Sequence, residues 1–171
     1  IDLRLRIPHW LKDGPVPSDI YRYAEKSTAS ASLRLNGKPV ELVFGKDGYV
    51  SLKRTWKSGD QLELNLPMPV RRVHAHEKIE ENNGKVALMR GPVVYCFEAV
   101  DNPDIDVFKV SLPQDAELKT EHRPDLLNGV TVIQTTGLDD EGQVVELTAI
   151  PYYAWSNRGQ APMRLWLPEA D

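Results

Sequence analysis

Hydrophobic and polar residues alternate with a period of two along much of this chain. The alternation runs through residues 1–7, 50–56 and 62–66, where apolar side chains at every second position are separated by polar or charged ones. Because successive side chains of a β-strand point to opposite faces, this pattern predicts strands with one buried face. Asn36-Gly37 lies between two further apolar runs and favours the positive φ angles of a tight hairpin turn.

The second half of the chain contains further short apolar segments between turn-forming residues. Residues 93–97 are apolar on both faces and predict a central strand that is covered on two sides. Other strands are expected at 86–89, 107–112, 130–134, 144–150 and 163–167. Only residues 18–26 could form a short helix. We therefore predict an all-β fold, an antiparallel β-sandwich of the jelly-roll or immunoglobulin-like type.

The strand pattern is interrupted most sharply at Pro67-Met68-Pro69. We therefore predict two small packed sandwich domains with a boundary near residue 75, one formed by residues 1–75 and a C-terminal one by residues 76–171. The chain begins inside a predicted strand, so we expect it to be a fragment in which the N-terminal strands of the first domain are missing. The first sheet would then have an exposed edge.

Composition excludes several classes of partner. The net charge of −4 is spread over scattered charged residues, without the basic stripe that nucleic acid requires. No apolar run approaches the roughly 20 residues of a membrane helix, so we expect a soluble chain without a membrane partner. The compartment stays open: a bacterial periplasm, the exterior or the cytoplasm. The single cysteine excludes an internal disulfide and cannot alone build a structural zinc site.

His74 and His76 are two residues apart, so on a strand both imidazoles would project from one face, as metal ligands can. Two ligands do not make a site, even with Glu77 and Glu80 nearby, and a solvated strand edge explains the pair better.

Cys96 lies among apolar neighbours, which predicts a buried, inert thiol rather than a nucleophile. We therefore predict no metal or cofactor site in this chain.

Asp139-Asp140-Glu141 supplies several carboxyl groups, which glycoside hydrolysis uses in pairs. The three acids are flanked by Gly137 and Gly142, and such a segment is typically a solvated hairpin tip. Nothing near them in the sequence would raise the pKa of one carboxyl group, as an acid catalyst requires. No catalytic residue is therefore predicted.

The strongest candidates for a contact site follow Pro151. Tyr152, Tyr153 and Trp155 are close together in the sequence, and Asn157 and Arg158 complete the segment. Aromatic faces stack on the apolar face of a sugar ring. A proline-stiffened loop can equally dock one domain onto another. We predict that these five residues contact either a sugar or another domain, and both interpretations stay open.

Several phrases of the sequence resemble the C-terminal half of glycoside hydrolase family 127, the β-L-arabinofuranosidase family. They are LRLRIPHW, LNGKPV, GYVSLKRTWKSGDQLELNLPMPVR, GKVALMRGPVVYCFEAVDN and LTAIPYYAWSNRG, in this order. The resemblance implies an enzyme in which an (α/α)6 barrel precedes β-sandwich domains. It also implies that the barrel holds zinc, a zinc-bound cysteine nucleophile and a glutamate acid/base. This chain has no helical repeat, so no catalytic residue is transferred to it.

Together, these observations predict a non-catalytic accessory region of a glycoside hydrolase that acts on arabinose-containing glycans. It would brace the absent barrel or form a wall of its substrate cleft. The alternatives are an independent carbohydrate-binding module and a protein–protein interaction domain. The expected partners are the catalytic barrel of the parent enzyme, a glycan, and a second copy of the chain in a homodimer.

Overall fold

The computed structural model describes residues 1–11 and 14–171. In this part of the chain, strands alternate with turns and 3-10 helices, and α-helices are absent. The all-β prediction is therefore confirmed. No helix among these residues is long and apolar enough to cross a membrane.

The strands are β1 (Asp2–Arg6), β2 (Tyr21–Tyr23), β3 (Ser32–Leu35), β4 (Lys38–Val40), β5 (Tyr49–Lys53), β6 (Leu62–Asn65), β7 (Val70–Ala75), β8 (Lys85–Arg90), β9 (Val93–Glu98), β10 (Leu112–Pro113), β11 (Lys119–Arg123), β12 (Val130–Leu138), β13 (Val144–Pro151), β14 (Met163–Arg164) and β15 (Leu167–Ala170). The 3-10 helices are η1 (His9–Leu11), η2 (Glu80–Asn82), η3 (Ala99–Asp101) and η4 (Tyr152–Ala154).

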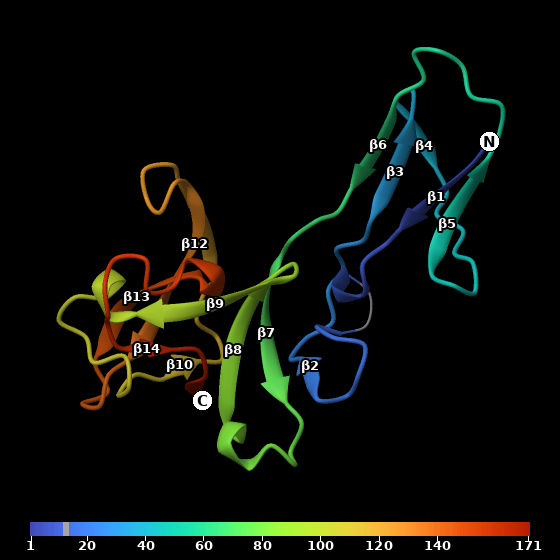
Figure 1. Ribbon diagram of the computed structural model, residues 1–171. Helices are drawn as coiled ribbons and strands as arrows, with labels where there is room; N and C mark the ends of the chain where they lie inside the picture. Colours follow the sequence, from blue (N-terminus) through green and yellow to red (C-terminus); the bar gives the residue numbers. More distant parts are fainter. Residues whose placement is uncertain (12–13) are drawn as a thin grey trace.

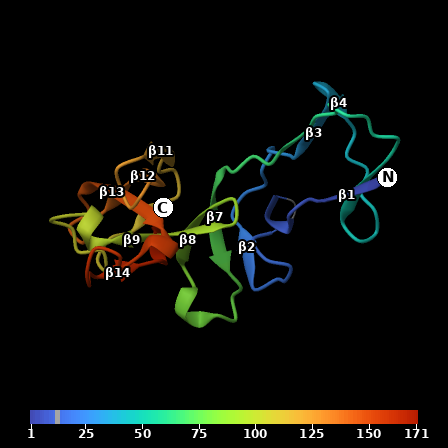
Figure 2. The same cartoon turned by 45° about the horizontal axis from the view of Figure 1, so that its top comes forward.

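Two small sheets form the first part of the molecule. Strand β1 pairs antiparallel with β5, and β3 pairs with both β4 and β6. Each sheet buries one face, as the alternating sequence predicts: Leu33 of β3 and Val50 of β5 are both buried. The predicted turn at Asn36-Gly37 is also confirmed, since both residues have positive φ, 51° and 77°. Figures 1 and 2 show these strands in a lobe away from β9 to β15.

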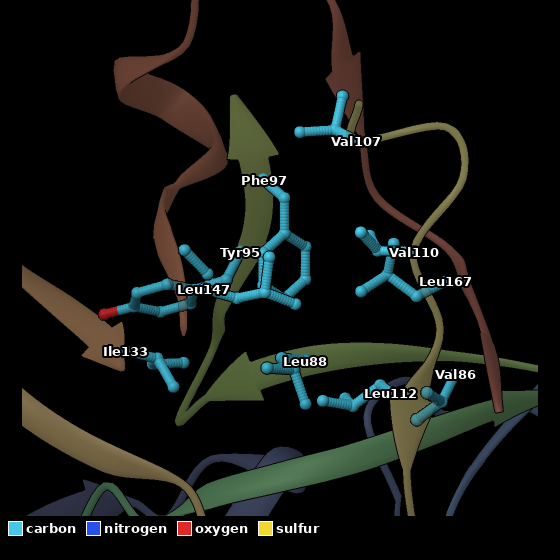
Figure 3. Close-up of a cluster of buried hydrophobic side chains, with 11 residues drawn as sticks. Val86, Leu88, Tyr95, Phe97, Val107, Val110, Leu112, Ile133, Leu147 and Leu167 are labelled. Carbon is cyan, nitrogen blue, oxygen red and sulfur yellow. The ribbon is translucent and has the colours of Figure 1, made fainter. Parts of the chain in front are cut away.

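The larger part of the molecule is built around one sheet, which has ten strands among the described residues. Its main path runs β10-β15-β8-β9-β13-β12-β11, and all pairs are antiparallel except β10 with β15. Leu112 and Leu167 near one end of the path pack in the same core as Ile133 and Leu147 near the other (Figure 3). The sheet therefore bends over its own core and supplies both layers around it.

Strand β9 lies at the centre of this arrangement. Tyr95 and Phe97 point into the main core, while Cys96 between them belongs to a second cluster with Val132 and Ile150. All of these side chains are almost completely inaccessible to water. The prediction of a strand covered on both faces is therefore confirmed for β9.

The helix predicted for residues 18–26 is wrong. Tyr21–Tyr23 instead forms β2, which pairs antiparallel with β7. The ring of Tyr21 stacks on Trp166 with centroids 5.8 Å apart, and the Arg71 guanidinium lies over the Tyr23 ring. These long-range contacts override the weak local helix preference. The same pairing joins the first part of the chain to the main sheet, and the domain boundary near residue 75 stays a prediction.

Two predicted strands are interrupted. Of residues 107–112, only Leu112 enters a strand, because Asp106 holds a turn: its side chain accepts a hydrogen bond from the Phe108 amide at 3.0 Å. Val110 is nevertheless buried in the main core. The strand expected at 163–167 is divided into β14 and β15, which pair with β9 and β8 respectively.

Gly137 lies where β12 passes closest to its neighbours. A Cβ atom at this position would come within 2.5 Å of a Leu147 methyl carbon and 2.9 Å of the Ser111 carbonyl oxygen. We expect Gly137→Ala to lower the free energy of unfolding by about 1–3 kcal/mol, because buried Leu147 and the Ser111 backbone must move. Urea denaturation measures this loss. Gly14→Ala is the matched control, since its Cβ would meet nothing closer than 3.6 Å, and equal effects of the two changes would contradict the packing argument.

Candidate functional site

Three exposed aromatic residues lie together just after strand β13. Tyr152, Tyr153 and Trp155, which we call the aromatic platform, are 44%, 70% and 40% exposed. The rings of Tyr152 and Trp155 stack with centroids 6.0 Å apart and an interplanar angle of 13°. Pro151 and Ala154 in the same segment are buried. Buried small residues thus fix the backbone while the large rings face water.

The segment that follows the platform is fixed by Arg158. Its guanidinium donates hydrogen bonds to Asp101 Oδ1 at 2.7 Å and to Glu98 Oε2 at 2.9 Å. The Glu98 and Asp101 side chains are only 1% and 6% exposed, and that of Arg158 is 25% exposed. Glu98 also accepts a hydrogen bond from the Ser156 amide at 3.2 Å. The end of β9 and helix η3 therefore hold the loop in a single geometry.

This arrangement also fixes the charge of Arg158. Hydrogen bonding to Asp101, followed by that to Glu98, raises the pKa of Arg158 above its ordinary value despite partial burial. The guanidinium is therefore permanently charged. The Asn157 side-chain amide donates to the Ala154 and Trp155 carbonyl oxygens at 3.0 and 3.4 Å, which closes the loop on itself. Of the five predicted contact residues, three aromatic ones thus face solvent and two fix the loop.

Glu98 and Asp101 could not be recognised from the sequence as part of this site. They lie 60 and 57 residues before Arg158. The one available signal was the charge of Glu98 at the end of an otherwise apolar strand, since a buried carboxylate requires a partner.

His74 and His76 have different partners. Nε2 of His74 lies 2.9 Å from Glu169 Oε2, whereas Nδ1 of His76 accepts a hydrogen bond from the Lys78 amide at 3.1 Å. Within residues 1–11 and 14–171, no group of three or more His, Cys, Asp or Glu could hold a metal ion. The zinc centre that the family resemblance implies is expected in the catalytic barrel, and the described residues of this chain do not fit one.

The carboxylates at 139–141 lie in the turn between β12 and β13. Asp139 Oδ1 accepts hydrogen bonds from the Glu141 and Gln143 amides at 3.0 and 2.7 Å, and Asp140 forms an exposed ion pair with Lys109. That hydrogen bond to Lys109 lowers the pKa of Asp140, so this carboxyl group is ionised and cannot donate a proton. The interpretation as a solvated hairpin tip is confirmed.

Cys96 is buried, as its neighbours predicted. Burial, aided by the negative charges of Glu98 and Asp101, raises the pKa of its thiol to about 12. We expect native Cys96 to resist a disulfide reagent at pH 8 and to react once guanidinium unfolds the chain, because only the thiolate is nucleophilic. Spectrophotometric thiol titration measures both states. Rapid reaction of the native protein would contradict the assignment.

The raised pKa of this thiol also has a consequence for stability. An unfolded thiol ionises near pH 8.5, so between about pH 8.5 and 12 the unfolded state binds fewer protons than the native one. The contribution of Cys96 to the free energy of unfolding is therefore complete below this interval and is lost as pH rises through it.

Comparison with protein families gives two matches that together cover nearly the whole chain. Residues 1–68 match the β-L-arabinofuranosidase GH127 middle domain, and residues 70–168 match the glycoside hydrolase family 127 C-terminal domain. Among curated proteins, the chain is 33% identical over 184 aligned residues to the non-reducing end β-L-arabinofuranosidase of Bifidobacterium longum. That alignment covers 95% of this chain and 25% of the relative.

Solved structures give the same result. A GH127 β-arabinofuranosidase structure matches with a TM-score of 0.89 and 38% identity, over 99% of this chain and 28% of the other. A GH127 β-L-arabinofuranosidase from Geobacillus stearothermophilus matches with a TM-score of 0.82 and 38% identity. This match covers 99% of this chain and 26% of the other. The chain thus spans about a quarter of the length of the proteins that it matches, and corresponds to their middle and C-terminal domains.

Proposed function

Because this chain belongs to glycoside hydrolase family 127, we propose that it is the accessory β-region of an enzyme that releases β-L-arabinofuranose from glycans. Its role is to brace an (α/α)6 catalytic barrel in the same polypeptide and to form part of the wall of the substrate cleft. The catalytic groups and any zinc belong to the barrel. The chain matches only about a quarter of the length of its relatives, which supports a multidomain protein of this kind.

The aromatic platform is the observation that carries this proposal. Tyr152, Tyr153 and Trp155 leave large apolar surfaces in water, at a cost of roughly 25 cal/mol per Å². Their loop is already ordered by the Arg158 ion pairs, so little conformational entropy would be lost when a partner covers the rings. An exposed but rigid apolar surface is well suited to permanent docking. We assign the catalytic barrel of the same polypeptide as its occupant.

Hydrolysis of an aryl β-L-arabinofuranoside by the purified chain tests the accessory role. We expect no turnover above that in buffer, because Asp140 is ionised and cannot act as an acid catalyst, and the Cys96 thiol is buried and protonated. Turnover that is abolished by Cys96→Ala would contradict the assignment.

The docking role is tested in the polypeptide that joins this chain to its catalytic region. Trp155→Ala is expected to lower both its thermal midpoint and its turnover, since the barrel would lose a buried aromatic contact. Trp155→Phe keeps an apolar ring, so it should retain most of the thermal midpoint and most of the turnover of the unchanged polypeptide. An unchanged midpoint in Trp155→Ala would contradict docking at the platform.

An independent carbohydrate-binding module is the second candidate. The nearly parallel rings of Tyr152 and Trp155 favour it, because flat exposed aromatic faces stack on sugars. This function predicts that arabino-oligosaccharides protect Trp155 fluorescence from acrylamide quenching. No change in quenching would speak against it. Self-association that is lost in Trp155→Ala would instead favour an interaction domain.

A further inference from the structure

A polar groove of about 490 Å³ lies between the β2 segment, the β7–β8 connection and strand β15. Its walls include Asp19, Arg22, His76, Glu77 and Asn82, with Glu169 also lining it. Its volume falls within the range of small-molecule sites, about 300–1,000 Å³. Its lining contains no Phe, Tyr or Trp, so the groove differs in chemistry from the aromatic platform.

Backbone contacts hold the segments around the groove together. The His76 amide donates to the Ile20 carbonyl oxygen at 2.8 Å, which ties the β2 segment to the end of β7. The Glu169 amide donates to the Gly84 carbonyl oxygen at 2.9 Å, and the Asn83 side chain donates to the Glu77 carbonyl oxygen at 3.1 Å. The groove is therefore preformed, and a ligand would not have to order it.

Several side chains on this rigid frame retain their full hydrogen-bonding capacity. Within the described residues, the side chains of Asp19, Arg22, Glu77 and Asn82 make no hydrogen bond or ion pair. Arg22 offers donors, the two carboxylates offer acceptors, and the Asn82 amide offers both. A sugar hydroxyl both donates and accepts, so it can use such a mixed set fully.

Two other ligand classes fit less well. A divalent cation is disfavoured because the described part of the chain has no cluster of three metal-ligating side chains. An anion is disfavoured because the carboxylates of Asp19 and Glu77 line the groove and have no cationic partner among the described residues, so both would repel it. We propose that the groove binds the hydroxyl groups of a neutral oligosaccharide, as a surface site separate from the aromatic platform. This inference rests on the proposed function insofar as the parent enzyme acts on glycans.

Titration of the chain with a neutral arabinofuranosyl trisaccharide, followed by amide NMR shifts, tests the inference. We expect saturable shifts at residues 19–22 and 76–85. Asp19→Ala and Arg22→Ala should each raise the dissociation constant about tenfold or more, because a hydrogen bond to a charged group is lost. Asp125→Ala and Arg34→Ala, which change exposed residues elsewhere, should leave it unchanged.

The outcomes separate this inference from the docking proposal. Binding that persists in Trp155→Ala and weakens in the two groove variants supports the groove site, whatever the platform does. Shifts confined to residues 152–159, no saturable shift, or unchanged affinity in both groove variants would overturn it. Tighter binding of trigalacturonate than of the neutral sugar would also overturn it, since the site would then recognise an anion.

Discussion

Arg158→Ala is expected to lower the free energy of unfolding by about 3 kcal/mol and to loosen the aromatic platform. The change leaves the carboxylates of Glu98 and Asp101 buried without their cationic partner, and an uncompensated buried charge is costly. It also releases the loop from the end of β9 and from η3. Urea denaturation measures the first effect, and acrylamide quenching of tryptophan fluorescence measures the second.

Two further variants make this result interpretable. Arg123→Ala removes a more exposed ion pair with Glu121 and is expected to cost at most about 1 kcal/mol. Glu98→Gln combined with Arg158→Met removes one buried charge along with its partner, and is expected to recover part of the loss of the single variant. If Arg158→Ala cost no more than Arg123→Ala, the ion pairs would not hold the loop.

Phe97→Ala is expected to cost about 4 kcal/mol of unfolding free energy, the largest effect that we predict. Phe97 is 1% exposed and lies in the core that both ends of the main sheet share (Figure 3). Its removal takes away buried apolar surface and leaves a cavity that a close-packed core closes only partly. Urea or thermal unfolding of the variant measures the loss.

Phe108→Ala is the matched control for this change. The ring of Phe108 is 54% exposed, and the Arg164 guanidinium lies 5.9 Å from its centroid, at the limit of a cation–π contact. We expect Phe108→Ala to lower the free energy of unfolding by less than about 1 kcal/mol. Similar losses in both variants would show that the core is not where the structure places it.

The features that the sequence predicted are those with a local cause. Alternation of apolar and polar residues fixes which face of a strand is buried, so β1, β5 and β6 could be located from the pattern alone. The positive φ angles at Asn36-Gly37 follow from the two residues themselves. Strand β9 could be placed at the centre because residues 93–97 have no polar face.

The features that the sequence did not predict depend on distant partners. Strand β2 exists because β7 offers an edge and Trp166 a stacking surface. Strand β11, Lys119–Arg123, is entirely polar and mostly exposed, so it carries no hydrophobic pattern, yet it pairs along the full length with β12. Strand β11 therefore leaves no hydrophobic signal within its own segment, and the alternation in Tyr21–Tyr23 is only three residues long, too short to identify β2 by itself.

The candidate site also has one part that the sequence could predict and one part that it could not. The segment with Tyr152, Tyr153 and Trp155 could be chosen from its composition, because several large aromatic side chains beside a proline are unusual. The role of Arg158 in fixing the loop could not be predicted from the sequence. Its acceptors Glu98 and Asp101 are brought close to it by the pairing of β9 with β13 and β14.

Hydroxyl-radical footprinting can show whether the catalytic region covers the aromatic platform. Oxidation of Tyr152, Tyr153 and Trp155 would be compared between this chain and the polypeptide that joins it to its catalytic region, with exposed Phe108 as the internal reference. We predict that the platform is oxidised readily in the chain alone and is protected in the longer polypeptide. Equal oxidation of the platform in both proteins would contradict its role as a docking surface.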